Sequence, residues 1–308
     1  MTERPLRPED FYDHHPTGWH APGDIWSDLP TFGLTREIGS RAVIITPACD
    51  LENCKTETIT YLPIVSVGAW TRSSAFARYV TPRVNDALRQ PPFVSAGMPR
   101  LPVVPSPGDL EQLDASLELG VRDNRWTAEV SAGVRNGLAA LRMVLQGRAL
   151  ADELADFGGL MPKKRRMETV GKAIGNALPE VHYLPPDEKP VAWTAVPDDS
   201  LILFRYPMTV PTAALELALD AELPDWTSAI TGISPPCPLR DALASRRPLR
   251  RARLRSVFAS DMLTRHVALH ARVGAPDLPD AQREMIVDRC CRPASTAGEG
   301  NSNEGQGR

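Results

Sequence analysis

Two kinds of hydrophobic pattern alternate along this chain, and together they predict an α+β fold. Short runs of β-branched and apolar residues that stop at proline or at polar turns are typical of strands. They occur in an early block, residues 23–68, and in a later block, residues 180–210, where turns rich in Pro and Asp indicate an antiparallel meander. The predicted strands are residues 23–26, 41–47, 56–67, 181–185, 191–196 and 201–206.

Apolar residues at spacings of three and four predict amphipathic helices between the two strand blocks and after the second. Residues 110–178 carry the first stripe, which continues in Met167, Val170 and Ile174. Residues 248–273 carry the second, and a glycine and a proline follow it as helix-ending residues. The stripes consist of Trp126, Val130, Val134, Leu138, Leu141 and Leu145 in the first region and Leu254, Phe258, Met262, Leu269 and Val273 in the second.

The two strand blocks lie about 110 residues apart, and a small antiparallel barrel split by a helical insertion accommodates both. Closing the sheet into a barrel also removes exposed edges, which suits short strands. A C-terminal helix completes this α+β fold. The predicted organisation is an N-terminal arm (1–22), a first half of the barrel (23–80), a Pro-rich loop and helical insertion (81–179), a second half of the barrel (180–215), a C-terminal helical segment (216–285) and a disordered tail (286–308).

Composition narrows the function classes. Proline makes up 30 of the 308 residues, roughly twice the usual share, which favours short elements joined by rigid turns. The net charge of −3 excludes a chain-wide polybasic binder but leaves local basic patches open. No run approaches the roughly 18 apolar residues of a membrane span, and the N-terminus lacks the apolar core of a secretory signal. Five scattered cysteines are not typical of a disulfide framework. We therefore expect a cytoplasmic protein without a membrane partner.

Three short motifs occur in the early block: Gly-Asp-Ile-Trp at 23–26, Gly-Ser-Arg-Ala-Val-Ile-Ile at 39–45 and Leu-Pro-Ile-Val-Ser at 62–66. Together they resemble the opening of the bacterial growth-inhibitor toxins of the PemK/MazF type. They match the family's G-D-I-[VW] start, its G-x-R-P element and its strand ending near P-I-T-S. Ala42 stands where the family has proline, and Val65 where it has threonine.

The chain also resembles larger uncharacterised bacterial proteins that carry a Cys-Asp-Leu tripeptide and an Arg-Val-Gly-x-Pro ending. The matching residues here are 49–51 and 272–276. No settled activity accompanies that second resemblance, so the functional expectations rest on the toxin family.

The toxin resemblance implies an SH3-like barrel that cleaves RNA without a metal or other cofactor. Carried over to this sequence, Arg41 would contact the scissile phosphate and Ser66 would assist. A planar guanidinium can bind two phosphate oxygens at once, which requires Arg41 to face outward from the barrel. Asp50 would join this catalytic set if it shares one concave pocket with them; the alternative is that Asp50 caps its own turn by bonding backbone N–H groups.

Two basic clusters are candidates for holding RNA. Lys163, Lys164, Arg165 and Arg166 are consecutive, and Arg250 and Arg251 belong to an arginine-rich stretch at 246–255. Each cluster could neutralise several phosphates. The alternatives are a solvated helix face, or arginine stems that cover apolar surface.

A metal site is a third possibility. Cys49 and Cys54 are five positions apart with two carboxylates between them, and His14, His15 and His20 could add nitrogens if the arm folds back. The alternative is that Cys49 is a small packing residue.

The chain lacks the G-x-x-x-x-G-K-[ST], G-x-G-x-x-G and G-x-S-x-G motifs, so ATPase, dinucleotide oxidoreductase and α/β-hydrolase activities are unsupported. The leading hypothesis is an RNA-directed, toxin-like protein that acts as an endoribonuclease if it is an enzyme. The second is a non-catalytic binding or adaptor module that keeps the barrel without the chemistry, as Ala42 and Val65 suggest, with RNA or a protein as its partner.

Overall fold

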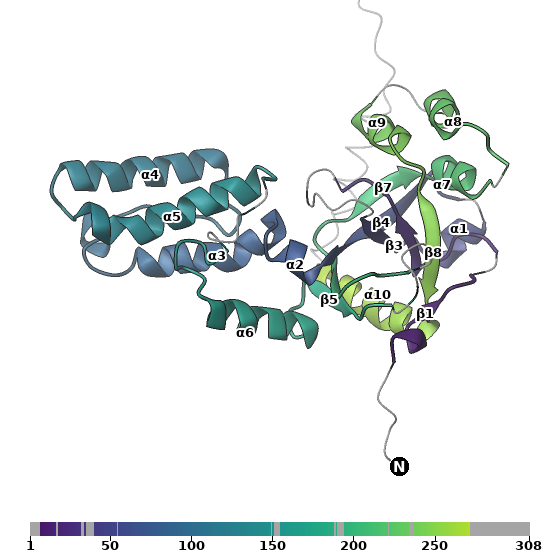
Figure 1. Ribbon diagram of the computed structural model, residues 1–308, viewed down its shortest axis with the longest axis horizontal. Coiled ribbons are helices and arrows are strands. Elements are labelled where there is room, and N and C mark those ends of the chain that lie inside the picture. Colours follow the sequence, from purple (N-terminus) through teal and green to yellow (C-terminus); the bar gives the residue numbers. More distant parts are fainter. Residues whose placement is uncertain are drawn as a thin grey trace, which may run out of the picture. The chain divides into compact units, whose positions relative to one another are not determined.

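The computed structural model describes residues 7–16, 18–31, 34, 40–53, 55–148, 150, 155–187, 189, 194–220, 222–233 and 237–271, and within them the chain is an α+β protein (Figure 1). The described helices are α1 (Ala48–Glu52), α2 (Val67–Trp70), α3 (Ser74–Ala87), α4 (Pro107–Arg122), α5 (Ala128–Leu145), α6 (Lys163–Ile174), α7 (Thr212–Leu219), α8 (Trp226–Ile233), α9 (Pro238–Ala244) and α10 (Ser256–His270).

The described strands form one antiparallel sheet that curls into a half-barrel (Figure 1). They are β1 (Tyr12–Asp13), β2 (Asp24–Ser27), β3 (Arg41–Ile44), β4 (Thr58–Ser66), β5 (Val181–Leu184), β6 (Ser200–Leu203), β7 (Met208–Pro211) and β8 (Leu249–Leu254). Their order is β1-β8-β2-β3-β4-β6-β5, and β7 also pairs with β4. The long strand β4 therefore joins the early strands to the later ones.

Alternate side chains of the central strands enter two different cores, as the two-residue period of a strand requires. Ile25, Val43 and Leu62 point to one core, which α10 covers with Ala259 and Met262. The opposite face, with Trp26, Ala42, Ile44 and Tyr61, packs against α7, α8 and α9. Because both faces are buried, the strands read as nearly continuous apolar runs.

The helices between β4 and β5 form a third core. The predicted stripe is largely confirmed there, because Trp126, Val134, Leu138 and Leu141 are all buried. Val130 of the same stripe is 47% exposed, so the packed face of α5 is narrower than the spacing predicts. The expected helical insertion between two strand blocks is present.

The predicted helix at 248–273 is wrong in its first part. Residues 249–254 form β8, which lies between β1 and β2, and the helix begins only at Ser256. In β8, Ala252 and Leu254 are buried while the arginines beside them remain partly exposed. Buried and partly exposed residues therefore alternate with the two-residue period of a strand. The sequence pattern does not show this alternation, because the arginines suggest exposed positions.

Other strand predictions also need correction. Of the predicted strand at 191–196, residues 194–196 belong to no strand and 191–193 lie outside the described residues. The strands β1 and β7 were not predicted. Val273, the Arg-Val-Gly-x-Pro ending and the predicted tail also lie outside the described residues. No helix in the described ranges is long and apolar enough to cross a bilayer.

Candidate functional site

Arg41 does not face outward, so that expectation is wrong. Its side chain lies at the start of β3 and the residue is only 7% exposed. Its Nε donates to the carbonyl of Ala195 over 3.1 Å, and a terminal nitrogen donates to the carbonyl of Thr194 over 3.5 Å. Burial lowers the pKa of Arg41, and the charge of Arg251 acts in the same direction. Since residues 194–196 have no strand partner, the guanidinium satisfies carbonyls that would otherwise be buried unpaired.

Ser66 and Asp50 do not join Arg41 in one pocket. Ser66 is the N-cap of α2, where its hydroxyl accepts from the N–H of Ala69 over 3.1 Å. Asp50 lies in α1, which follows the far end of β3, so Arg41 and Asp50 flank opposite ends of that strand. Cys49 is exposed, and its sulfur lies 3.7 Å from an Asp50 oxygen. None of the described cavities is lined by Arg41 together with Asp50 or Ser66, so the condition for a catalytic role of Asp50 is not met.

The metal candidates gain no support from the described residues. Cys54 lies outside them, and among those that the structure describes no three His, Cys, Asp or Glu side chains are grouped so that they could hold a metal ion.

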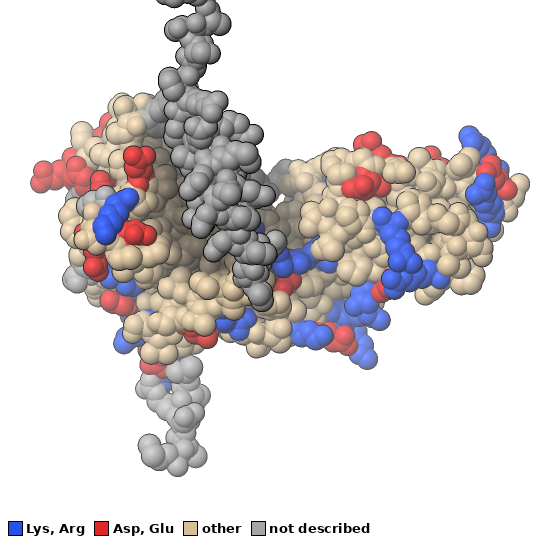
Figure 2. Space-filling model, turned by 180° about the vertical axis from the view of Figure 1, so that it is seen from behind, with Lys and Arg blue, Asp and Glu red and all other residues tan. Residues whose placement is uncertain are grey.

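The two basic clusters differ from each other. Lys163, Lys164 and Arg165 are exposed in the first turn of α6, whereas Arg166 donates to the carbonyl of Ala155 over 2.8 Å. Cations in a first helical turn oppose the helix dipole, so this cluster carries an electrostatic cost. On the face drawn in Figure 2, Lys and Arg side chains are interspersed with Asp and Glu.

Arg250 and Arg251 are engaged within the fold. Arg250 donates to the carbonyls of Pro16, Gly18 and Trp19, and Arg251 donates through Nε to the Ser27 hydroxyl over 3.0 Å. They fasten the N-terminal arm and β2 to β8, which makes them structural arginines rather than a free phosphate-binding surface.

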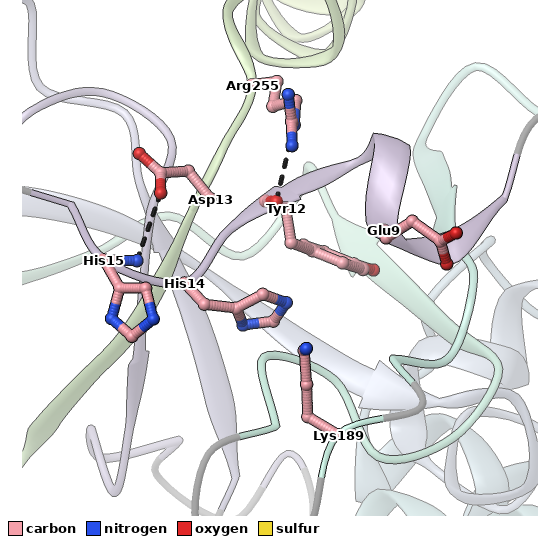
Figure 3. Close-up of a pocket in the computed structure, with 7 residues that line it drawn as sticks. All are labelled: Glu9, Tyr12, Asp13, His14, His15, Lys189 and Arg255. Carbon is pink, nitrogen blue, oxygen red and sulfur yellow. Dashed lines mark hydrogen bonds between the residues drawn. The ribbon is translucent and has the colours of Figure 1, made fainter.

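A cavity in the described part of the chain lies along the N-terminal arm, where β1 meets β8. Its volume is about 460 Å³. It brings two histidines, two cations, two carboxylates and a phenol around one space (Figure 3). The lining residues are Glu9, Tyr12, Asp13, His14, His15, Lys189 and Arg255.

A buried carboxylate stands behind His14. The Nε2 of His14 is 3.5 Å from Oδ1 of Asp187, and the side chains are 15% and 3% exposed. Asp187 accepts from the N–H of Ala195 over 2.8 Å and from the Thr194 hydroxyl over 3.4 Å. The carboxylate is thus held in place by the segment whose carbonyls Arg41 binds. A carboxylate fixed beside an imidazole can orient that ring.

A cation, a second imidazole and a phenol surround the His14 ring. In Figure 3 the Lys189 ammonium points toward the His14 ring, and the His15 ring lies on the other side of it. Tyr12 donates its hydroxyl to the Pro185 carbonyl over 2.6 Å, and burial, helped by the charge of Asp187, raises its pKa. Tyr12 is therefore an uncharged side chain that lines the cavity. The cavity contains what acid–base transfer at a phosphate needs: two imidazoles and a cation.

The sequence does not predict this site. His14 and His15 suggest only metal ligands there, and residues 185–188 suggest only a turn. The available signal was the pair of adjacent histidines, but Asp187 is 173 positions from His14, so only the fold brings them together.

His182 also faces a carboxylate but has a different environment. Its side chain is 4% exposed and its Nδ1 is 3.8 Å from Asp261. Burial lowers the pKa of His182 to about 4; the charge of Arg265 acts in the same direction, and that of Asp261 opposes it. It is a neutral core residue.

This burial predicts acid sensitivity. As pH falls, the unfolded chain protonates His182 near its ordinary pKa, about 6.5, before the folded chain does. The contribution is therefore complete above about pH 6.5 and is lost toward pH 4, by up to about 3 kcal/mol. Urea unfolding of wild type and His182→Gln at pH 7 and pH 4 checks this. The variant should lose less stability between the two pH values, and equal losses would contradict the prediction.

Comparisons with protein-family models, curated proteins and solved structures found no match to this chain.

Proposed function

We propose that this chain cleaves RNA in the His14 cavity, by attack of a ribose 2′-hydroxyl on the adjacent phosphodiester. The observation that carries the proposal is His14 at 3.5 Å from a carboxylate, Asp187, that is itself buried and hydrogen-bonded. A second imidazole, His15, and the Lys189 ammonium line the same cavity.

Each step of the reaction has a group of this cavity to serve it. His14 takes the proton from the 2′-hydroxyl, and the oxygen forms a bond to phosphorus. The bond from phosphorus to the 5′-oxygen breaks, and the leaving oxygen takes a proton from His15. Lys189 stabilises the negative charge that builds on the phosphoryl oxygens. The products are a 2′,3′-cyclic phosphate and a 5′-hydroxyl.

Arg41 acts in this proposal as a positioning residue. It binds the carbonyls of Thr194 and Ala195, and Ala195 donates to Asp187. The exposed cations in the first turn of α6 would hold the RNA strand, which gives a reason for charges that oppose the helix dipole.

We also propose a relationship to the SH3-like barrel of the PemK/MazF toxins. The motifs at 23–26, 39–45 and 62–66 fall on β2, β3 and β4, which are neighbours in the sheet. In this relationship the catalytic groups have moved, since Arg41 packs inward and the cavity is built from the arm.

Cleavage of matched oligonucleotides tests the proposal. The purified full chain is incubated with single-stranded RNA, and with the same sequence as DNA, in buffer containing EDTA. We expect cleavage of the RNA alone, with 2′,3′-cyclic phosphate ends, because the attacking group is the 2′-hydroxyl. Intact RNA at stoichiometric protein, or equal cleavage of the DNA, would overturn the proposal.

A non-catalytic binding module is the second candidate. The exposed face of α6 favours it, because Met167, next to the cations of the first turn, is 63% exposed and Ile174, at the other end of the helix, is 40% exposed. A surface that is both apolar and basic is suited to binding a partner, either RNA or a protein. RNA that is retained uncut, with retention lost in a Lys163→Glu, Lys164→Glu double variant, would favour binding alone.

A further inference from the structure

A second cavity lies beside His20 and has no part in the proposed cleavage. Its volume is about 140 Å³, which equals the share of roughly four to five water molecules at about 30 Å³ each. The arm contributes Trp19 and His20, α1 contributes Asp50, and α7 contributes Glu216. It shares no lining residue with the His14 cavity.

His20 is the group that lacks a partner. It is 4% exposed, and within the described part of the chain neither ring nitrogen has a hydrogen-bond partner. Buried polar side chains in folded proteins are normally paired, and an imidazole always offers a donor or an acceptor. Trp26 packs against the ring with centroids 5.5 Å apart, which fixes its position. A ligand in the cavity would supply the missing partner.

The charge of the cavity favours a cation. Asp50 and Glu216 line it, and no lysine or arginine is among its described lining residues. The two arginines whose charges act on His20, Arg250 and Arg253, are paired with Asp24 at 3.5 and 2.5 Å. Burial lowers the pKa of His20, as do the charges of those two arginines, while Asp24 opposes them. A neutral imidazole can accept a hydrogen bond from a cationic donor.

The shape and chemistry favour an organic cation. No metal-holding group of His, Cys, Asp and Glu is found in the described ranges. Trp19 at the rim is 68% exposed and offers a free indole face. Among cationic head groups, the planar guanidinium both stacks on aromatic faces and donates several hydrogen bonds in one plane.

We propose that the His20 cavity binds a guanidinium head group, with Asp50, Glu216 and the His20 imidazole accepting its N–H groups and the Trp19 indole covering its face. The head group belongs either to a small molecule or to an arginine side chain. The proposal does not depend on RNA cleavage.

Titration with methylguanidine tests this site. The full chain is labelled with ¹⁵N, the indole N–H signal of Trp19 is identified with Trp19→Phe, and its shift is followed. We expect saturable binding with a dissociation constant on the order of millimolar, as suits so small a ligand. Methylurea has the same shape without the charge and should not bind. Asp50→Asn should weaken binding about tenfold or more, because one charged acceptor is lost.

A carboxylate elsewhere supplies the matched control. Asp86→Asn changes an exposed carboxylate on α3 and should leave binding unchanged. His20→Phe should abolish binding, and if that variant does not fold, Asp50→Asn on the short surface helix decides the matter. Equal affinity for methylurea, no effect of Asp50→Asn, or no saturable shift would each overturn the proposal.

The source of the head group is resolved by a second ligand. Binding of the peptide Gly-Arg-Gly at least as tightly as methylguanidine supports an arginine side chain. Binding of methylguanidine without the peptide supports a free small molecule.

Discussion

Replacing His14 with glutamine is expected to reduce RNA cleavage by about 10²–10⁴-fold, the usual contribution of a positioned acid–base group. Glutamine keeps much of the volume and polarity of the side chain but cannot take the proton from the 2′-hydroxyl. The rate to measure is the first-order cleavage of an RNA oligonucleotide with a single susceptible bond. Because His14 is only 15% exposed on its side chain, unfolding curves of both proteins must agree before the rates are compared.

The control is a histidine outside the cavity. His270→Gln changes an exposed imidazole at the end of α10 and should cleave at the wild-type rate. That control also detects a contaminating ribonuclease, since such an enzyme would cleave equally in all three preparations. Unchanged cleavage by His14→Gln would remove His14 from the reaction.

Replacing Asp187 with asparagine tests the same site through a second residue. Asp187→Asn can keep an oxygen for the N–H of Ala195 but loses the charge opposite His14. The cleavage rate should fall while the affinity for RNA stays, because Asp187 acts on His14 and not on the strand. A fall in affinity alone would assign Asp187 to binding instead.

Secondary structure was predictable where one face of an element is packed and the other is exposed. The buried positions Val134, Leu138 and Leu141 lie on one side of α5, and their spacing in the sequence shows it. The strand β8 was not predictable in the same way, because arginines occupy half of its six positions and suggest an exposed helix. Their long stems and backbone-directed donors let Arg250 lie within a sheet.

The site was less predictable than the fold for a physical reason. A strand-end arginine gives the same sequence signal whether it faces solvent or, as Arg41 does, binds the carbonyls of a loop 154 residues away. Pairing of His14 with Asp187 depends on the arm running beside β8 and on where the loop after β5 lies. Neither contact has a local pattern, so no spacing rule can find it.

The motif at 23–26, which carries part of the toxin resemblance, has a structural role that can be measured through Asp24. This carboxylate begins β2 and is fully buried at 0% exposure. Arg253 donates to it over 2.5 Å, Arg250 lies 3.5 Å away, and the N–H of Ala21 donates over 3.0 Å. Asp24 therefore joins β2, β8 and the arm.

Asp24→Asn is expected to destabilise the protein by about 3–5 kcal/mol, the usual result of removing one partner from a buried ion pair. The variant leaves two arginine charges without their counterion. Thermal unfolding should show a fall in Tm of roughly 10 °C for a chain of this size. The matched control is Asp86→Asn, because Asp86 also pairs with two arginines, Arg83 at 3.2 Å and Arg89 at 3.4 Å, but on the exposed side of α3. Exposed pairs contribute about 1 kcal/mol or less, so equal losses in the two variants would show that the Asp24 cluster does not hold the half-barrel together.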